Sequence, residues 1–127
     1  MPEQVSDFLV RRLSEWGVRK IFGLPGDGIN GLLGALDRAG TIDFILAPHE
    51  ELAALMATAH AKLTGELSVC LATSGPGALH LLTGLYDARL DRAPVLALVG
   101  QQPTFGLGGS EQQEVNLSAV MQDVAQA

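Results

Sequence analysis

The sequence is poor in cysteine, in aromatic residues and in basic residues. Its one cysteine, Cys70, excludes an internal disulfide and a cysteine metal cluster, so we expect no structural metal. Eight Lys and Arg stand against fourteen Asp and Glu, a net charge of −6, which lacks the basic footprint of a nucleic-acid-binding protein. No apolar run approaches the ~20 residues of a membrane span, and the first residues lack the basic and apolar regions of a signal peptide. We therefore expect a cytoplasmic protein without a nucleic-acid or membrane partner.

Apolar residues and glycine are abundant instead. Of the 127 residues, 47% are hydrophobic and 17% are charged, which is the reverse of a disordered chain. This length predicts one domain, spanning residues 1–127. The fifteen glycines, together with the apolar character, indicate close approach of backbone segments and a surface that other protein covers. The plain expectation is a domain that is part of a larger assembly.

Hydrophobic periodicity predicts helices and strands in alternation. The expected helices span residues 5–16, 28–38, 50–63 and 78–90, with a weak one at 115–124. The expected strands span residues 19–23, 41–46, 67–72 and 94–99. The last two strands are almost continuously apolar, as in a parallel sheet that is buried on both faces. The order predicts an α/β fold, a doubly wound, mostly parallel sheet with helices on both faces.

The larger apolar residues of the helices define the faces that we expect to be buried. In the first four helices these are, in order, Val5, Phe8, Leu9, Leu13 and Trp16; Ile29, Leu32, Leu33 and Leu36; Leu52, Leu55, Met56, Ala59 and Leu63; and Leu79, Leu82, Leu85 and Tyr86. Cys70 falls inside an apolar strand and is expected to be an inert core thiol.

Three loops follow strands and should therefore meet at one edge of the sheet. They span residues 24–28, 47–50 and 73–77. In an open parallel sheet, ligands bind outside the carboxyl ends of the strands. Function is therefore to be sought at this edge.

The first loop matches the glycine pattern of dinucleotide-binding proteins. Residues 26–31 read Gly-Asp-Gly-Ile-Asn-Gly after a strand and before a helix, so the glycines could bring a pyrophosphate to the helix N-terminus. Asp27, however, places a negative charge where the phosphate should lie. A turn that requires glycine dihedrals is the simpler interpretation, and a dinucleotide-binding module remains an alternative.

The second loop leads into the sequence His49-Glu50-Glu51 at the start of the third helix. Position 53 is Ala53, so the His-Glu-x-x-His pattern of a zinc protease is not met. Two carboxylates suit a helix N-terminus, but the helix that follows is apolar almost all round. A carboxylate in such a place needs a partner to offset its burial, which favours a chemical role for one of the two.

Five motifs together resemble one enzyme family. They are Gly-Leu-Pro-Gly-Asp at 23–27, His-Glu-Glu at 49–51, Ala-Lys-Leu-Thr-Gly at 61–65, Thr-Ser-Gly-Pro-Gly at 73–77 and Gly-Leu-Tyr-Asp-Ala-Arg at 84–89. In order and spacing they resemble the N-terminal pyrimidine-binding domain of thiamine-diphosphate-dependent enzymes, in the pyruvate oxidase and acetolactate synthase group. The resemblance covers nearly the whole chain and implies the thiamine-diphosphate-binding fold.

The resemblance also implies roles for individual residues. Glu50 matches the glutamate that hydrogen-bonds N1′ of the aminopyrimidine and so activates the cofactor for loss of its C2 proton; it is the expected catalytic residue. The positions that match the lining of the cofactor pocket are Pro25, Gly26, Glu50, Thr73, Pro76, Gly77, His80 and Gln113. Glu51 is expected to be only a carboxylate of the first helical turn.

The family enzymes contain parts that this chain does not have. They act on a 2-keto acid such as pyruvate, hold Mg²⁺ on a separate diphosphate-binding domain, and in some cases hold FAD. Their pyrimidine domain packs on the diphosphate domain of a partner subunit. By this resemblance the chain is an incomplete part of a homo-oligomeric keto-acid enzyme, has no metal ligands and is inactive alone. The alternative is a stand-alone interaction or regulatory domain of the same fold.

Overall fold

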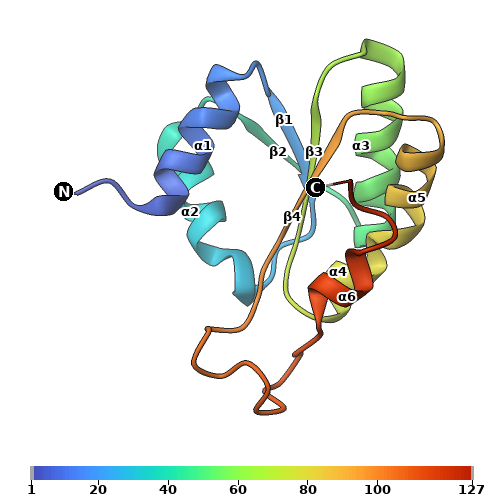
Figure 1. Ribbon diagram of the computed structural model, residues 1–127. Helices are drawn as coiled ribbons and strands as arrows, with labels where there is room; N and C mark the ends of the chain where they lie inside the picture. The colour runs from blue at the N-terminus through green and yellow to red at the C-terminus, as the bar shows by residue number, and fades with distance from the viewer. Residues whose placement is uncertain (1, 127) are drawn as a thin grey trace.

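A four-stranded, all-parallel sheet forms the centre of the molecule in the computed structural model, which describes residues 2–126 (Figure 1). The strands are β1 (Lys20–Gly23), β2 (Asp43–Leu46), β3 (Ser68–Ala72) and β4 (Val95–Val99), in the order β2-β1-β3-β4. Phe22 in β1 lies opposite Ile45 of β2 and Cys70 of β3. The predicted doubly wound α/β fold is confirmed, and each strand lies within its expected range.

Helices cover both faces of the sheet. One face carries α1 (Val5–Glu15) and α2 (Asn30–Ala39), the latter preceded by the short helix η1 (Asp27–Ile29). The other face carries α3 (Glu50–Thr64), α4 (Pro76–His80), α5 (Leu82–Leu90) and α6 (Leu117–Met121). The third helix ends where the sequence predicts, because Gly65 takes the left-handed conformation with φ of 73° and caps it. None of the helices in residues 2–126 is long and apolar enough to cross a membrane.

Two separate cores result, because successive side chains of each strand point to opposite faces. The core under α1 and α2, here called the aliphatic layer, contains Val10, Leu13, Val18, Ile21, Ile29, Ala35, Leu36, Ile42, Val69 and Leu71. The core under α3 and α5, here called the alanine layer, contains Phe22, Ala47, Ala53, Ala54, Ala57, Cys70, Ala72 and Leu81. Burial in this layer raises the pKa of the Cys70 thiol to about 12, so the expectation of an inert core thiol fits its position.

The expected buried faces of three helices are wrong in large part. In α1 the buried residues are Val10 and Leu13, whereas the rest of the expected stripe is exposed: Val5, Phe8, Leu9 and Trp16. In α3 the small residues turn inward, and Leu52 and Leu63 are exposed. Between residues 76 and 90 the buried residues are Gly77, Ala78, Leu81, Gly84 and Ala88, while Leu79 and Tyr86 are 38% exposed. Small residues are buried where α5 packs closely on α3, since a Cβ on Gly84 would lie 2.5 Å from the Cβ of Ala54.

Two helix boundaries and the burial of one strand also differ from expectation. The single helix expected at 78–90 is two helices, α4 and α5, which meet at Leu81. The helix expected at 115–124 is confined to Leu117–Met121. β4 is half-buried along its whole length and not buried on both faces, because it is the edge strand of the described sheet.

Candidate functional site

The three loops meet at the carboxyl edge of the sheet, and glycines hold two of them in contact. The backbone N–H of Gly28 donates a hydrogen bond of 3.1 Å to Thr73 Oγ1. A Cβ on Gly26 would lie 2.5 Å from the Thr73 Cβ, so only glycine fits there. The backbone therefore packs on protein where a dinucleotide would need free N–H groups for its phosphates. None of Gly26, Gly28 and Gly31 has a positive φ, so the expectation of a turn that requires glycine dihedrals is wrong. Glycine is required at 26 and 28 because both pack closely on Thr73. The dinucleotide alternative loses its main support, because the N–H of Gly28 is already hydrogen-bonded.

Glu50 is the buried carboxylate of this edge. It is the first residue of α3 and only 6% exposed. Its Oε2 lies 2.9 Å from Nδ1 of His80, at the end of α4. The partner that the sequence argument required is thus a histidine from the neighbouring helix. Glu51 lies beside it and is half-buried.

Gly77 gives the other oxygen of Glu50 its room. A Cβ at this position would lie 3.4 Å from Glu50 Oε1 and 2.9 Å from Thr73 Cγ2. Pro76 precedes it as the first residue of α4, where a missing N–H costs nothing. The structure therefore gathers Glu50, Thr73, Gly77 and His80, four of the positions singled out in the sequence, around one carboxyl group.

His49 belongs to the same cluster, although the sequence did not single it out as a site residue. It caps α3, because its Nδ1 accepts the backbone N–H of Glu51 at 3.2 Å. Its ring stacks on that of His80, with centroids 4.4 Å apart and planes 32° apart. Its place next to Glu50 was the only signal available, and spacing along the chain could not reveal the contact with His80.

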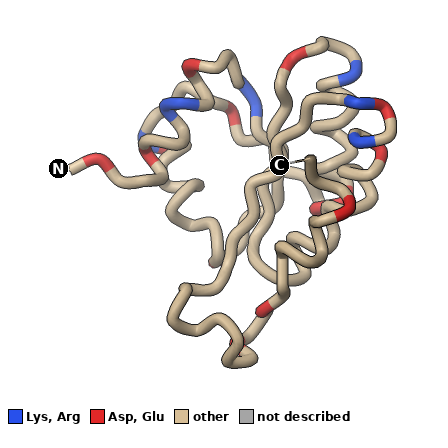
Figure 2. The backbone as a smooth tube through the Cα atoms, in the orientation of Figure 1, with Lys and Arg blue, Asp and Glu red and all other residues tan. Residues whose placement is uncertain are grey.

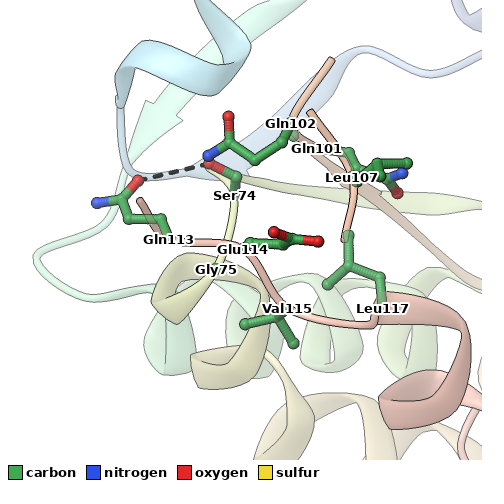
Figure 3. Close-up of a pocket in the computed structure, with 10 residues that line it drawn as sticks. Ser74, Gly75, Gln101, Gln102, Leu107, Gln113, Glu114, Val115 and Leu117 are labelled. Carbon is green, nitrogen blue, oxygen red and sulfur yellow. Dashed lines mark hydrogen bonds between the residues drawn. The ribbon is translucent and has the colours of Figure 1, made fainter. Parts of the chain in front are cut away.

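Gln113 reaches this edge from the long connection after β4, where it contacts Ser74 and Gly75 of the third loop. Ser74 Oγ donates a hydrogen bond of 3.4 Å to Gln113 Oε1 (Figure 3). Gly75 has φ of 64°, and a Cβ there would lie 2.4 Å from the Gln113 carbonyl oxygen. Gln113 thus packs on the third loop and not on Glu50. Pro25 lies exposed in the first loop.

Basic residues are absent from this edge. The segments 24–28, 47–50, 73–77 and 100–116 contain no Lys or Arg, and Figure 2 shows the basic residues elsewhere on the molecule. A diphosphate needs cations or a metal ion to balance its charge. This edge offers a carboxylate and two imidazoles instead, which suit a neutral nitrogen base or a cation.

Comparison with known proteins gives a consistent match. The family model described as thiamine pyrophosphate enzyme, N-terminal TPP binding domain, matches residues 3–120. The chain is 49% identical to the protein YdaP of Bacillus subtilis over 114 residues and 45% identical to pyruvate oxidase of Lactiplantibacillus plantarum over 118 residues. It is 38% identical to the large subunit of acetolactate synthase isozyme 3 of Escherichia coli over 119 residues. These matches cover 89%, 92% and 94% of this chain but only 20%, 20% and 21% of the relatives, so the chain spans about a fifth of their length.

Proposed function

The chain belongs to the thiamine pyrophosphate enzymes, as their N-terminal TPP-binding domain, and from this premise we propose that it forms the pyrimidine half of a cofactor site. The whole enzyme would decarboxylate a 2-keto acid such as pyruvate, as an oxidase or as a synthase. This chain would supply the group that activates the cofactor, and it would be inactive alone.

The observation that carries the proposal is the burial of Glu50 at the carboxyl edge of the sheet. A glutamate that is 6% exposed is costly unless a partner shares its charge or its proton. Among residues 2–126, the side chain hydrogen-bonded to it is that of His80, which meets Oε2. Oε1 lies beside Gly77, whose missing side chain leaves space next to this oxygen. Oε1 is therefore the atom that we assign to N1′ of the aminopyrimidine.

The residues present fit such a ring. A carboxyl group can hold or release a proton at Oε1, and a ring nitrogen of an aminopyrimidine can share that proton. Thiamine diphosphate, once bound, supplies the carbanion chemistry for cleaving a bond next to a carbonyl group. His80 holds Oε2 and so fixes the orientation of the carboxyl plane. Thr73 and Gly26 form the wall next to Gly77.

The diphosphate end would be held by another part of the enzyme. The carboxyl edge has no Lys or Arg to balance a diphosphate, which supports a Mg²⁺ site on a separate diphosphate-binding domain of a partner subunit. A groove of about 680 Å³, lined mainly by apolar residues of β4, α5 and α6, runs beside the half-buried edge strand. Such a surface is usually covered, so it supports a homo-oligomeric, multidomain enzyme.

A chimera tests this function directly. The matching segment of Lactiplantibacillus plantarum pyruvate oxidase, 45% identical over 118 residues, would be replaced by this chain. We expect the chimera to bind thiamine diphosphate with Mg²⁺ and to consume pyruvate, and the isolated chain to do neither, because it has half a site. Calorimetry and a pyruvate-consumption assay provide the two measurements.

Two outcomes would contradict the proposal. Tight binding of thiamine diphosphate by the isolated chain would mean that it assembles a whole site. A folded chimera that binds no cofactor would favour the alternative of an interaction or regulatory domain that retains only the fold. Titration with NAD serves as the control for the glycine pattern, and we expect no heat from it.

A further inference from the structure

We propose that His49, Glu50 and His80 form a binding site for a divalent transition-metal ion, with Zn²⁺ as its reference ligand. Each of the three side chains offers one ligand atom, and these atoms all lie within 4.8 Å of one another. Two histidines and one glutamate are a donor set that zinc uses with a fourth position left to water. The three residues come from two segments, the start of α3 and the end of α4.

The geometry requires only a small adjustment. Zinc bonds of about 2.0–2.2 Å place tetrahedral ligand atoms roughly 3.3–3.5 Å apart. Glu50 Oε2 and His80 Nδ1 are already 2.9 Å apart, so a metal ion could replace the proton that they share. The His80 side chain is 44% exposed and can turn to bring its ring closer to that of His49. Glu50 is buried and is therefore the ligand with the least freedom to move.

Coordination by His49 changes the cap of α3. In the metal-free structure Nδ1 of His49 accepts the N–H of Glu51 at 3.2 Å. If Nδ1 coordinates, its lone pair is used; if Nε2 coordinates, the proton moves to Nδ1. In both cases the cap hydrogen bond is lost. Metal binding therefore exchanges one hydrogen bond for a metal–imidazole bond.

The electrostatic surroundings favour a cation over an anion. Glu50 and Glu51 both lie in the first turn of α3, and their charges offset the positive end of the helix dipole. The four segments of the carboxyl edge contain no Lys or Arg that would repel the ion. The imidazoles select against Mg²⁺, which prefers oxygen ligands in octahedral geometry.

Zinc and the cofactor would exclude each other. This consequence rests on the proposed function, because both ligands would then use the Glu50 carboxyl group. The metal site itself does not rest on it, since zinc binding can be measured on this chain without thiamine diphosphate. A failure of one proposal therefore leaves the other standing.

The test is calorimetric titration of the 127-residue chain with ZnCl₂ near neutral pH. We expect saturable binding of one zinc per chain and no heat from MgCl₂. Co²⁺ in place of zinc should give the intense visible absorption of four-coordinate cobalt. H80A and H49A should each weaken zinc binding by about tenfold or more, since each removes one ligand. E50Q should do the same.

Two variants serve as matched controls. H60A removes the third histidine of the chain, which lies on α3 outside the cluster, and E51Q removes the neighbouring carboxylate. H60A should bind zinc as the parent chain does, and E51Q, which removes a nearby charge but no ligand atom, should weaken binding far less than H80A or H49A. H80A takes the hydrogen-bond partner from the buried Glu50 carboxyl group, so its folding is checked by circular dichroism, and H49A, which leaves that pair in place, provides the second ligand variant. Absence of saturable binding at millimolar zinc, weak octahedral cobalt absorption, or unchanged binding in folded H80A would overturn the proposal.

Discussion

The two faces of the sheet are packed differently. On one face, large aliphatic side chains fill the space under α1 and α2, whereas on the other face alanine is the commonest buried residue under α3 and α5. The alanine layer lets backbones approach closely: a Cβ on Gly84 of α5 would lie 2.5 Å from the Cβ of Ala54 on α3. The same layer holds Glu50 in place. The candidate site therefore lies on the face with short side chains, where close packing of α3 and α5 leaves the Glu50 side chain little room to move.

The largest effect should come from truncating a side chain of the aliphatic layer. Leu71 is fully buried, so Leu71→Ala leaves a cavity and should lower the free energy of unfolding by about 2–5 kcal/mol. Leu63 on α3 is 87% exposed, and Leu63→Ala should change the free energy of unfolding by less than about 0.5 kcal/mol. Urea denaturation measures both. Similar losses in the two variants would contradict the assignment of the buried faces.

The alanine layer should respond to the opposite change, an added methyl group. Gly84→Ala would place its Cβ within 2.6 Å of the Ala54 and Leu55 backbone, and overpacking of this kind costs about 1–3 kcal/mol. In the matched control Gly31→Ala, on α2, the nearest atom is Ser6 Oγ at 4.0 Å. Removing a helical glycine should there stabilise the protein by roughly 0.5–1 kcal/mol. A stabilising Gly84→Ala would mean that α3 and α5 are not in close contact.

The alanine layer should also make stability depend on pH through Cys70. Burial raises the thiol pKa from 9.0 to about 12, so the folded state keeps the proton longer than the unfolded chain. The contribution is fully present below pH 9 and is lost as pH rises toward 12. At pH 10, which is one unit above the thiol pKa in the unfolded chain, the free energy of unfolding should be lower by about 1.4 kcal/mol. Urea denaturation at pH 8 and pH 10 measures the change, and the Cys70→Ala variant should lose less stability between these two pH values than the parent protein does. An equal loss in both proteins would mean that the Cys70 thiol is exposed to water.

The smallest effect concerns the hydrogen bond that joins α3 to α5. Thr58 is fully buried, and its Oγ1 donates to the Gly84 carbonyl oxygen at 3.0 Å. Thr58→Val keeps the shape and removes the donor, which should cost about 1 kcal/mol. Thr83→Val, at an exposed position of α5, provides the reference for a lost hydroxyl. Equal unfolding free energies for these two variants would mean that the buried bond contributes nothing.

The success of sequence-based prediction differs from helix to helix. In the second expected helix, Ile29 and Leu36 are buried as predicted, whereas in α1, on the same face of the sheet, only Leu13 of the expected stripe is buried. On α3 the same reasoning selected Leu52 and Leu63, which are exposed. A search for hydrophobic periodicity selects leucine as the buried residue in preference to alanine. Where two helices pack closely, alanine is buried and leucine faces outward. The elements could therefore be predicted, but not the orientation of every helix.

At the candidate site the sequence identified the edge, the buried carboxylate and its need for a partner. The partner could not be chosen from the sequence, since His80 is 30 residues away and meets Glu50 only through the placement of α4 against α3. The position of His80 just after the third loop drew attention to it, and the family resemblance assigned it to the cofactor pocket, but neither paired it with Glu50. The contact of His49 with His80 was missed by both.

The measurement that tests the central claim most directly is hydrogen–deuterium exchange at C2 of thiamine diphosphate bound to the chimera. If Glu50 shares its proton with N1′, Glu50→Gln should slow the exchange by about 100-fold or more and change cofactor affinity far less. Glu51→Gln, which alters the neighbouring carboxylate, should leave the exchange rate close to that of the parent chimera. An exchange rate unchanged by Glu50→Gln would contradict the role assigned to this buried carboxylate.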